Sequence, residues 1–120
     1  MKKIHIAIII ALAPFKAISE PKIDAYKAPF YVGETVMACG TVKQVSAKKQ
    51  ANFLNLDEQY PNQTLTLLIW NNNLDTFTKR FGDLNYLKGH RVCARGKITE
   101  YKGSLQIKLT NAQFLRLMRK

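Results

Sequence analysis

Two neighbouring segments, Ala51-Asn-Phe-Leu-Asn-Leu-Asp57 and Thr64-Leu-Thr-Leu-Leu-Ile-Trp-Asn71, decide the fold of this chain. Both are short and rich in aliphatic and aromatic residues, which is typical of strands near the centre of a sheet. The linking residues Tyr60-Pro61-Asn62-Gln63 include proline and asparagine, which favour a turn. The sequence therefore predicts two central strands joined by a turn.

Three further strands are expected around this pair. Thr35–Val45 alternates apolar and polar residues with the period of a half-buried strand, and Gly40 within it suggests a bulge or a sharp bend. Gly89–Ile98 repeats the rhythm, with valine, alanine, glycine and isoleucine at alternate positions. Leu105–Thr110 follows a turn around Gly103 and is the last strand of the set.

A short helix is expected at Leu74–Phe81, between the third and fourth strands. Asn73 is placed to cap its start, and Gly82 is placed to end it. Three strands, a short helix and two strands are the order of an all-β, five-stranded OB-fold Greek-key barrel.

Three short motifs strengthen this interpretation. Phe53-Leu54-Asn55, Tyr60-Pro61-Asn62 and Tyr101-Lys102-Gly103 resemble motifs of OB-fold nucleic-acid-binding domains of the anticodon-binding, tRNA-anti-like type. The resemblance covers about Tyr31 to Phe114 and implies a nucleic-acid-binding barrel, here in a secreted, single-domain bacterial form.

The first residues have the pattern of a secretory signal peptide. Lys2 and Lys3 precede an apolar run that is interrupted only by His5, and small residues follow at Ala17 and Ser19. Cleavage is expected after Ser19, with Ala17 as the alternative, and the product would be periplasmic or secreted. The run is too short to cross a bilayer, which needs about 20 residues, so no transmembrane segment is expected.

The remaining chain is long enough for one domain. Removing residues 1–19 leaves 101 of the 120 residues, which suffices for a single modest core. We expect a lead-in segment at 20–31, the OB-fold domain at 32–114 and a basic tail at 115–120. The periodicity of Asn111–Lys120 fits a packed helix or an extended arm equally well.

The positive charge is unevenly distributed along the sequence. The formal charge of +11 falls to +8 without the three lysines of residues 1–19, and residues 20–87 hold as many acidic as basic residues. The excess begins at Lys88, after which Glu100 is the only acid. This asymmetry suggests a polyanionic partner, which could be nucleic acid, an anionic lipid or an acidic cell-wall polymer. Alternatively, the basic charge only contributes to the solubility of the protein.

The resemblance implies a ligand face on the second and third strands, flanked by the loops Ser46–Gln50 and Thr99–Ser104. Single-stranded nucleic acid is bound in such sites by lysines for phosphates and by aromatic rings for bases. The candidate binding residues are Lys48, Lys49, Asn52, Asn55, Thr66, Trp70, Arg91, Arg95, Tyr101, Lys102 and Lys108. Phe53 is a further candidate for the floor of this ligand face. Phe53 and Trp70 would alternatively belong to the core, and Lys48 and Lys49 to a solvated loop.

Cys39 and Cys93 fall on the polar, outward phase of the first and fourth strands, which are neighbours in an OB barrel. An oxidising compartment and adjacent strands favour a disulfide between them.

Binding is favoured over catalysis. His90 is the one histidine after residue 19, and no cluster of histidine, cysteine and carboxylates has metal-ligand spacing. We therefore expect no enzyme activity, metal or cofactor, but a periplasmic or secreted protein that binds single-stranded DNA or RNA with little sequence preference. One alternative is an envelope adaptor that binds cell-wall polymers, lipid A or a protein partner. The other is an OB-fold nuclease, for which Asp57 and Glu58 lack a third acid.

Overall fold

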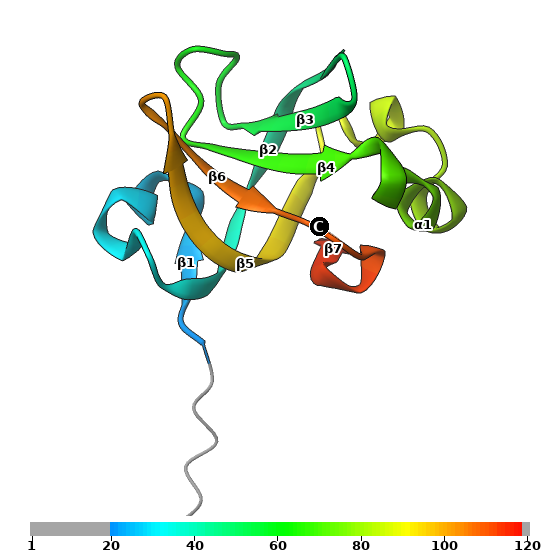
Figure 1. Ribbon diagram of the computed structural model, residues 1–120. Helices are drawn as coiled ribbons and strands as arrows, with labels where there is room; N and C mark the ends of the chain where they lie inside the picture. Colours follow the sequence, from blue (N-terminus) through cyan, green and yellow to red (C-terminus); the bar gives the residue numbers. More distant parts are fainter. Residues whose placement is uncertain (1–19, 119–120) are drawn as a thin grey trace, which may run out of the picture.

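The computed structural model describes residues 20–118 of the chain, so the predicted signal peptide, Arg119 and Lys120 lie outside the described residues. The protein is mostly β-structure, with seven strands in the order β1-β2-β3-β4-β6-β5-β7 and short helices at the periphery (Figure 1). The strands are β1 Lys22–Asp24, β2 Thr35–Lys48, β3 Ala51–Leu56, β4 Leu65–Trp70, β5 Arg91–Tyr101, β6 Ser104–Lys108 and β7 Leu115–Leu117. The helices are α1 Asn71–Phe81 and the 3-10 turns η1 Ala25–Tyr31, η2 Leu84–Leu87 and η3 Ala112–Phe114. Within residues 20–118, no helix is long and apolar enough to cross a membrane.

The prediction of five strands is wrong in number. The five expected strands are β2 to β6, and β1 and β7 extend the sheet from the lead-in segment and the tail. β1 pairs in parallel with β2, and β7 pairs antiparallel with β5. Each added strand has three residues, which is too short to show an alternating pattern in the sequence. The tail is therefore extended over Leu115–Leu117 and forms no α-helix there.

The five longer strands pair in a ring. β2 pairs with β5 through Thr35–Thr41 and with β3 through Val42–Lys48, and the pairs β3–β4, β4–β6 and β6–β5 connect the other members. The register irregularity of β2 lies between Val42 and Gln44, not at Gly40 as predicted. A Cβ at Gly40 would lie 3.0 Å from Asp57 Oδ1 and 3.2 Å from Ala25 Cβ. The glycine is therefore explained by close packing.

Side chains of the ring strands form the hydrophobic core, and helices cover this core at two ends. Figure 1 shows η1 and α1 on opposite sides of the strands. Ala25 and Ala28 of η1, and Phe77 of α1, are fully buried in the same cluster as the aliphatic residues of the ring. The β2–β3 turn therefore lies near α1, and the helices do not cover the outward face of the strands.

Helix α1 differs from the prediction at its start. It begins at Asn71, directly after β4, and Trp70 occupies the N-cap without a side-chain hydrogen bond, so the predicted cap at Asn73 is wrong. The backbone N–H of Asn71 donates to the carbonyl of Gln50 (2.8 Å), which ties the helix start to the β2–β3 turn. The predicted end is confirmed, because Gly82 has φ of 77° and its N–H donates to the Thr78 carbonyl.

The predicted disulfide between Cys39 and Cys93 is confirmed. The two residues lie directly opposite each other in the β2–β5 register. Both are on the outward phase, yet they are 2% and 1% exposed, because longer side chains beside them, including Met37 and Arg95, enclose the short bridge.

Candidate functional site

The registers of the strands define one continuous outward surface, which we call the front face. Because side chains alternate across a strand, the partners of an outward residue on the next strand also point outward. The first row across the face is Gln44, Asn55, Thr66 and Gln106. The second row is Ser46, Phe53, Leu68 and Lys108. The third row is Lys48, Ala51 and Trp70.

Three residues of the first row, Gln44, Asn55 and Thr66, form a hydrogen-bonded polar seam. Asn55 donates through Nδ2 to Gln44 Oε1 (2.7 Å) and accepts from the Thr66 hydroxyl at Oδ1 (2.8 Å). Asn55 and Thr66 are 3% and 6% exposed. These two predicted binding residues therefore lie beneath the surface, where their polar groups hold neighbouring strands together.

The seam continues into two loops. Gln63 Nε2 donates to Thr66 Oγ1 (3.0 Å) and Ser104 Oγ (3.5 Å), and Gln44 Oε1 accepts the backbone N–H of Tyr60 (2.9 Å). The seam thus fixes the β3–β4 loop against the start of β6. Gln63 Oε1 is buried without a hydrogen-bond partner among the described residues.

The second and third rows carry the accessible apolar and basic groups. Trp70 is 40% exposed, Phe53 is half-buried, and Lys108 is exposed beside them. Lys48 and Lys49 are exposed at the turn between β2 and β3, where Lys49 has φ of 58°. The structure therefore brings together five of the predicted contacts at this end of the face.

Tyr101 and Lys102 lie at the opposite end of the face, in the β5–β6 hairpin. Tyr101 is 58% exposed, and the Lys102 ammonium lies 5.4 Å from the centre of its ring. Tyr60, in the adjacent β3–β4 loop, is 65% exposed. The two predicted loops therefore flank the face from its two ends.

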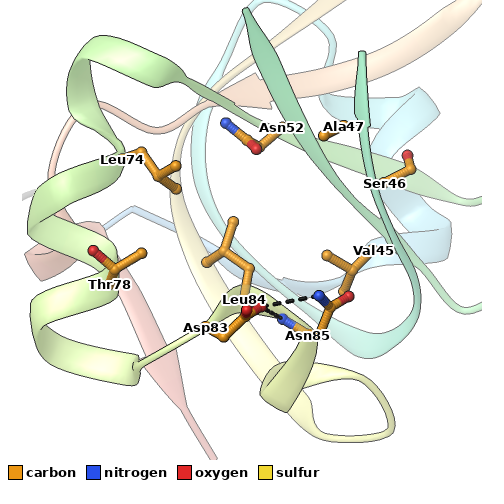
Figure 2. A pocket seen from close by; sticks show the side chains of 9 residues that line it. All are labelled: Val45, Ser46, Ala47, Asn52, Leu74, Thr78, Asp83, Leu84 and Asn85. Carbon is orange, nitrogen blue, oxygen red and sulfur yellow. Dashed lines mark hydrogen bonds between the residues drawn. The ribbon is translucent and has the colours of Figure 1, made fainter.

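Asn52 lies away from the front face, on the inward phase of β3. Its Nδ2 donates to the Ile69 carbonyl (3.1 Å) and to Asn71 Oδ1 (2.8 Å). Figure 2 shows it at the edge of a cavity of about 330 Å³ between α1 and the β2–β3 hairpin. The cavity has apolar walls from Leu74 and Leu84, and Asp83 and Asn85 hydrogen-bond to each other at its rim. Asn52 is thus separated from the other candidates.

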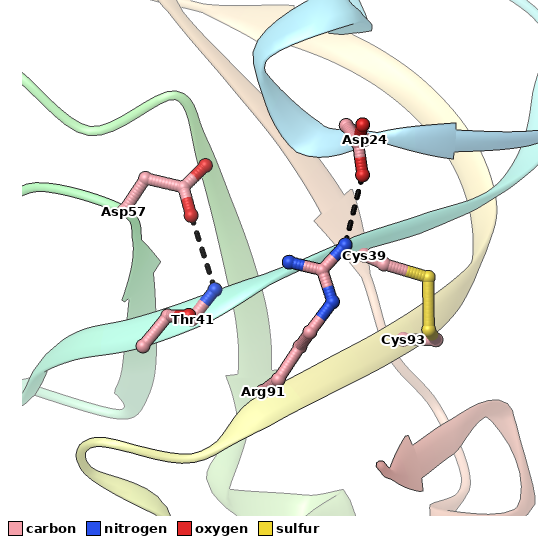
Figure 3. Close-up of a disulfide and its surroundings, with 6 residues drawn as sticks. All are labelled: Asp24, Cys39, Thr41, Asp57, Arg91 and Cys93. Atoms are coloured by element: carbon pink, nitrogen blue, oxygen red, sulfur yellow. Dashed lines mark hydrogen bonds and ion pairs between the residues drawn. A yellow bond between two sulfur atoms is a disulfide. The ribbon is translucent and has the colours of Figure 1, made fainter. Parts of the chain in front are cut away.

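Arg91 and Arg95 also lie elsewhere, on the part of β5 that pairs with β2 and carries the disulfide. Figure 3 shows Arg91 near this disulfide. Arg91 forms an ion pair with Asp24 (2.8 Å). Arg95 donates from Nε to Glu20 (2.8 Å), and its guanidinium lies 5.9 Å from the centre of the Phe114 ring. The hydrogen bond to Arg95 holds the pKa of Glu20 below its usual value and raises the pKa of Arg95. Both arginines are thus neutralised by acids of the N-terminal segment.

Sequence reasoning missed three residues that shape the face, namely Gln44, Tyr60 and Gln63. Tyr60 lies in the turn motif Tyr60-Pro61-Asn62, but the sequence does not show that its side chain is exposed. Gln44 accepts a hydrogen bond from Asn55 and Gln63 donates one to Ser104. Both partners lie in other segments, and a linear sequence carries no signal for those pairings.

Comparisons with known proteins identify no family for this chain. No protein-family model matches it, and no curated protein matches it. Among solved structures, OBody AM1L10 bound to hen egg-white lysozyme is similar, with a TM-score of 0.55 and 15% identity over 77% of this chain and 86% of that chain. The Stn1-Ten1 complex of S. pombe matches with a TM-score of 0.54 and 17% identity, over 77% of this chain and 68% of that one.

A putative aspartyl-tRNA synthetase from Leishmania major Friedlin matches 88% of this chain with a TM-score of 0.52 and 10% identity. Only 22% of that longer chain is covered. At these identities the likeness concerns the fold alone. The protein has an OB-like fold.

Proposed function

We propose that this protein binds single-stranded nucleic acid across the front face, with little sequence preference and without catalysis. The observation that carries the proposal is the juxtaposition of an exposed Trp70 with Lys48, Lys49 and Lys108 on one face of an OB-like fold. The ring of paired strands supports a closed, five-stranded OB barrel, in which this is the usual ligand surface.

The spacing of the rows favours an unpaired strand. Successive rows are two residues apart along each strand, which corresponds to about 6.8 Å. Bases in one strand of a duplex are separated by about 3.4 Å. Phe53 and Trp70, in consecutive rows, would therefore each stack on a separate base of an extended strand.

Weak sequence preference is expected because Asn55 and Thr66, the buried residues of the seam, offer no free recognition groups at the surface. The amide of Asn55 and the hydroxyl of Thr66 are used within the sheet. Base reading needs hydrogen-bond donors and acceptors that are free to meet the ligand, whereas stacking and phosphate contacts tolerate any sequence.

Trp70 offers a direct test, because it is the only tryptophan of the chain. We expect an unlabelled single-stranded oligonucleotide to change the fluorescence of Trp70 in a saturable manner, and a duplex of equal length to have a smaller effect.

Tyr101→Ala should weaken binding by roughly tenfold to a hundredfold if this ring stacks on one base. Tyr86→Ala is the matched control, since Tyr86 is 70% exposed on η2, away from the front face. Absence of binding at low salt would refute the proposal.

We also propose a periplasmic or secreted location. The Cys39–Cys93 disulfide supports this, because such bonds persist mainly in oxidising compartments.

A second candidate function is docking to an envelope partner. Three apolar side chains of the N-terminal segment, Tyr26, Phe30 and Val32, are 60%, 80% and 48% exposed, and Lys27 lies 5.9 Å from the centre of the Tyr26 ring. Aromatic and basic residues together suit the interface of an anionic membrane. Sedimentation with anionic vesicles would test this, and loss of sedimentation in Phe30→Ser, with oligonucleotide binding retained, would support it.

A further inference from the structure

The cavity between α1 and the β2–β3 hairpin shares an edge with the front face (Figure 2). Ser46 lines this cavity and also belongs to the second row of the face. Asn52 lines the cavity as well, and its Nδ2 donates to the Ile69 carbonyl and to Asn71 Oδ1. These two acceptors belong to the residues on either side of Trp70 in the chain. Asn52 therefore connects the cavity with the backbone that carries the exposed indole.

Two hydrogen-bond acceptors of the cavity have no donor within residues 20–118. Both hydrogens of Asn52 Nδ2 are used, but its Oδ1 accepts no hydrogen bond there, and Figure 2 shows this oxygen on the cavity side. Asp83 Oδ1 accepts from the backbone N–H (2.8 Å) and from Nδ2 (2.9 Å) of Asn85, which fixes the carboxylate and leaves its Oδ2 free. Asp83 is also the only charged residue among the nine described residues that line the cavity. The cavity therefore suits a ligand that brings N–H donors and no negative charge of its own.

The other walls of the cavity are apolar and enclose a small volume. Leu84 is buried, and Val45 and Leu74 are half-buried. Cavities for drug-sized ligands measure about 300 to 1,000 Å³, so the volume of about 330 Å³ is at the lower limit of that range. A single heterocyclic ring system suits such a space, because its faces pack against aliphatic side chains while its edge carries the donors. A nucleobase has this chemistry, and its phosphate can stay outside the cavity.

The free acceptors distinguish between bases. Cytosine carries an amino group at the position where thymine carries a carbonyl oxygen. The amino group can donate to Asp83 Oδ2 or to Asn52 Oδ1, which replaces the water that these oxygens lose when the cavity is filled. A carbonyl oxygen at the same position would leave them without a donor, which costs binding free energy.

We infer that this cavity takes one base with an exocyclic amino group from a single strand that continues over Trp70. This inference rests on the proposed function for the rest of the strand. It adds base preference at one position to a front face that otherwise has little. It also makes Asn52, which lies off that face, a contact of the bound base.

A scan of one deoxycytidine through a short oligothymidylate tests the inference, with the all-thymidine strand as the reference. We expect the deoxycytidine to strengthen binding by roughly threefold to tenfold near one end of the strand. It should have no effect near the other end, because the remaining nucleotides must still cover the front face. An equal affinity at every position would refute the inference while leaving single-strand binding intact.

Three variants show whether the cavity is the cause of the gain. Asp83→Asn keeps the oxygen that accepts from Asn85 and exchanges Oδ2 for a donor, so the gain from deoxycytidine should disappear. Thr78→Phe should have the same result, because the ring fills the cavity from α1. Asp75→Asn is the control, since it removes the same charge at an exposed position of α1 outside the cavity, and the gain should persist. A gain that also persists in Asp83→Asn and Thr78→Phe would overturn the inference.

Cytidine and uridine test the cavity without the front face. We expect cytidine to shift the side-chain amide resonance of Asn52 in ¹H–¹⁵N spectra in a saturable manner, and uridine at equal concentration to shift it less. Equal shifts from the two nucleosides would overturn recognition of the amino group. Failure of every oligonucleotide to bind would refute the proposed function itself, and the comparison of cytidine with uridine would still decide what the cavity takes.

Discussion

At the scale of single residues, Asn55 shows how a side chain on a ligand face can have a structural role. Its amide connects Gln44 on β2 with Thr66 on β4, and almost none of it is accessible. The sequence predicted Asn55 and Thr66 only as contacts of the ligand face that the resemblance implies. It did not show their burial, which depends on the side chains of Gln44 and Gln63 in other segments.

We predict that Asn55→Ala lowers the free energy of unfolding by about 1 to 3 kcal/mol, because it removes the acceptor of the buried Thr66 hydroxyl and one of the two donors to Gln44 Oε1. Urea denaturation would measure the change. Asn62→Ala is the control, since Asn62 is exposed in the β3–β4 loop, and its effect should stay within about 0.5 kcal/mol. Equal stability of the two variants would contradict a supporting role for the seam.

Glu20 provides a pH-dependent test at the same scale. Its pKa is lowered from 4.5 by the hydrogen bond from Arg95, so its contribution to stability is present above pH 4.5 and is lost as the pH falls through the lowered pKa. We predict that Glu20→Gln has a slightly lower Tm than the wild type at pH 7, and that the difference shrinks below pH 4.5. Asp75→Asn, in an exposed pair with Lys79, is the control. A difference that grows on acidification would contradict this assignment.

At the scale of elements, β5 connects two parts of the sheet. It pairs with β2 as far as Lys97 and with β6 from Ile98 onward. Gly96 lies just before this change of partner, and a Cβ there would approach Ile107 Cγ2 to 2.5 Å. Close approach to β6 therefore requires glycine at this position.

We predict that Gly96→Ala costs about 1 to 3 kcal/mol of stability, because Ile107 is fully buried and cannot move without disturbing the core. Thermal or urea unfolding would measure it. Thr99→Ala, at an exposed position of the same strand, should have little effect. A wild-type Tm for Gly96→Ala would show that the strand adjusts without strain.

The elements also show what sequence patterns can predict. β2 and β5 were predicted from alternation, β3 and β4 from their aliphatic and aromatic residues, and β6 from the turn around Gly103. The C-terminal end of α1 was predicted from Gly82. β1 and β7 did not, because three residues are too few for a period. The start of α1 was placed too late because a hydrogen bond to Gln50, from a distant turn, sets its position.

At the scale of the whole molecule, the charge asymmetry of the sequence does not map onto one surface. Lys102 and Lys108 lie on the front face with Lys48 and Lys49 from the other part of the chain. Arg91 and Arg95 lie on the other part of the sheet and pair with acids. The sequence therefore predicted a basic surface for a polyanionic partner. The position of that surface on the molecule depends on how the strands fold around the core.

The four front-face lysines make the salt dependence of binding predictable. Each phosphate neutralised on a single strand contributes about −0.7 to the slope of log K against log salt, so four contacts give roughly −3. We predict that Lys108→Gln reduces the magnitude of the slope by about 0.7. Lys97→Gln, outside the face, should not change it. If Lys108→Gln and Lys97→Gln had the same slope of log K against log salt, the phosphate contacts would lie elsewhere than at Lys108.

The two short strands at the margins have a consequence for behaviour at high concentration. The open edges of the sheet are β1 and β7, each three residues long. They carry Lys22, Asp24 and Arg116, all exposed. Short, charged edges are poor templates for the addition of another chain. The longer, more apolar strands β3 and β4 have partners on both sides, so the fold itself protects this protein from edge-to-edge aggregation.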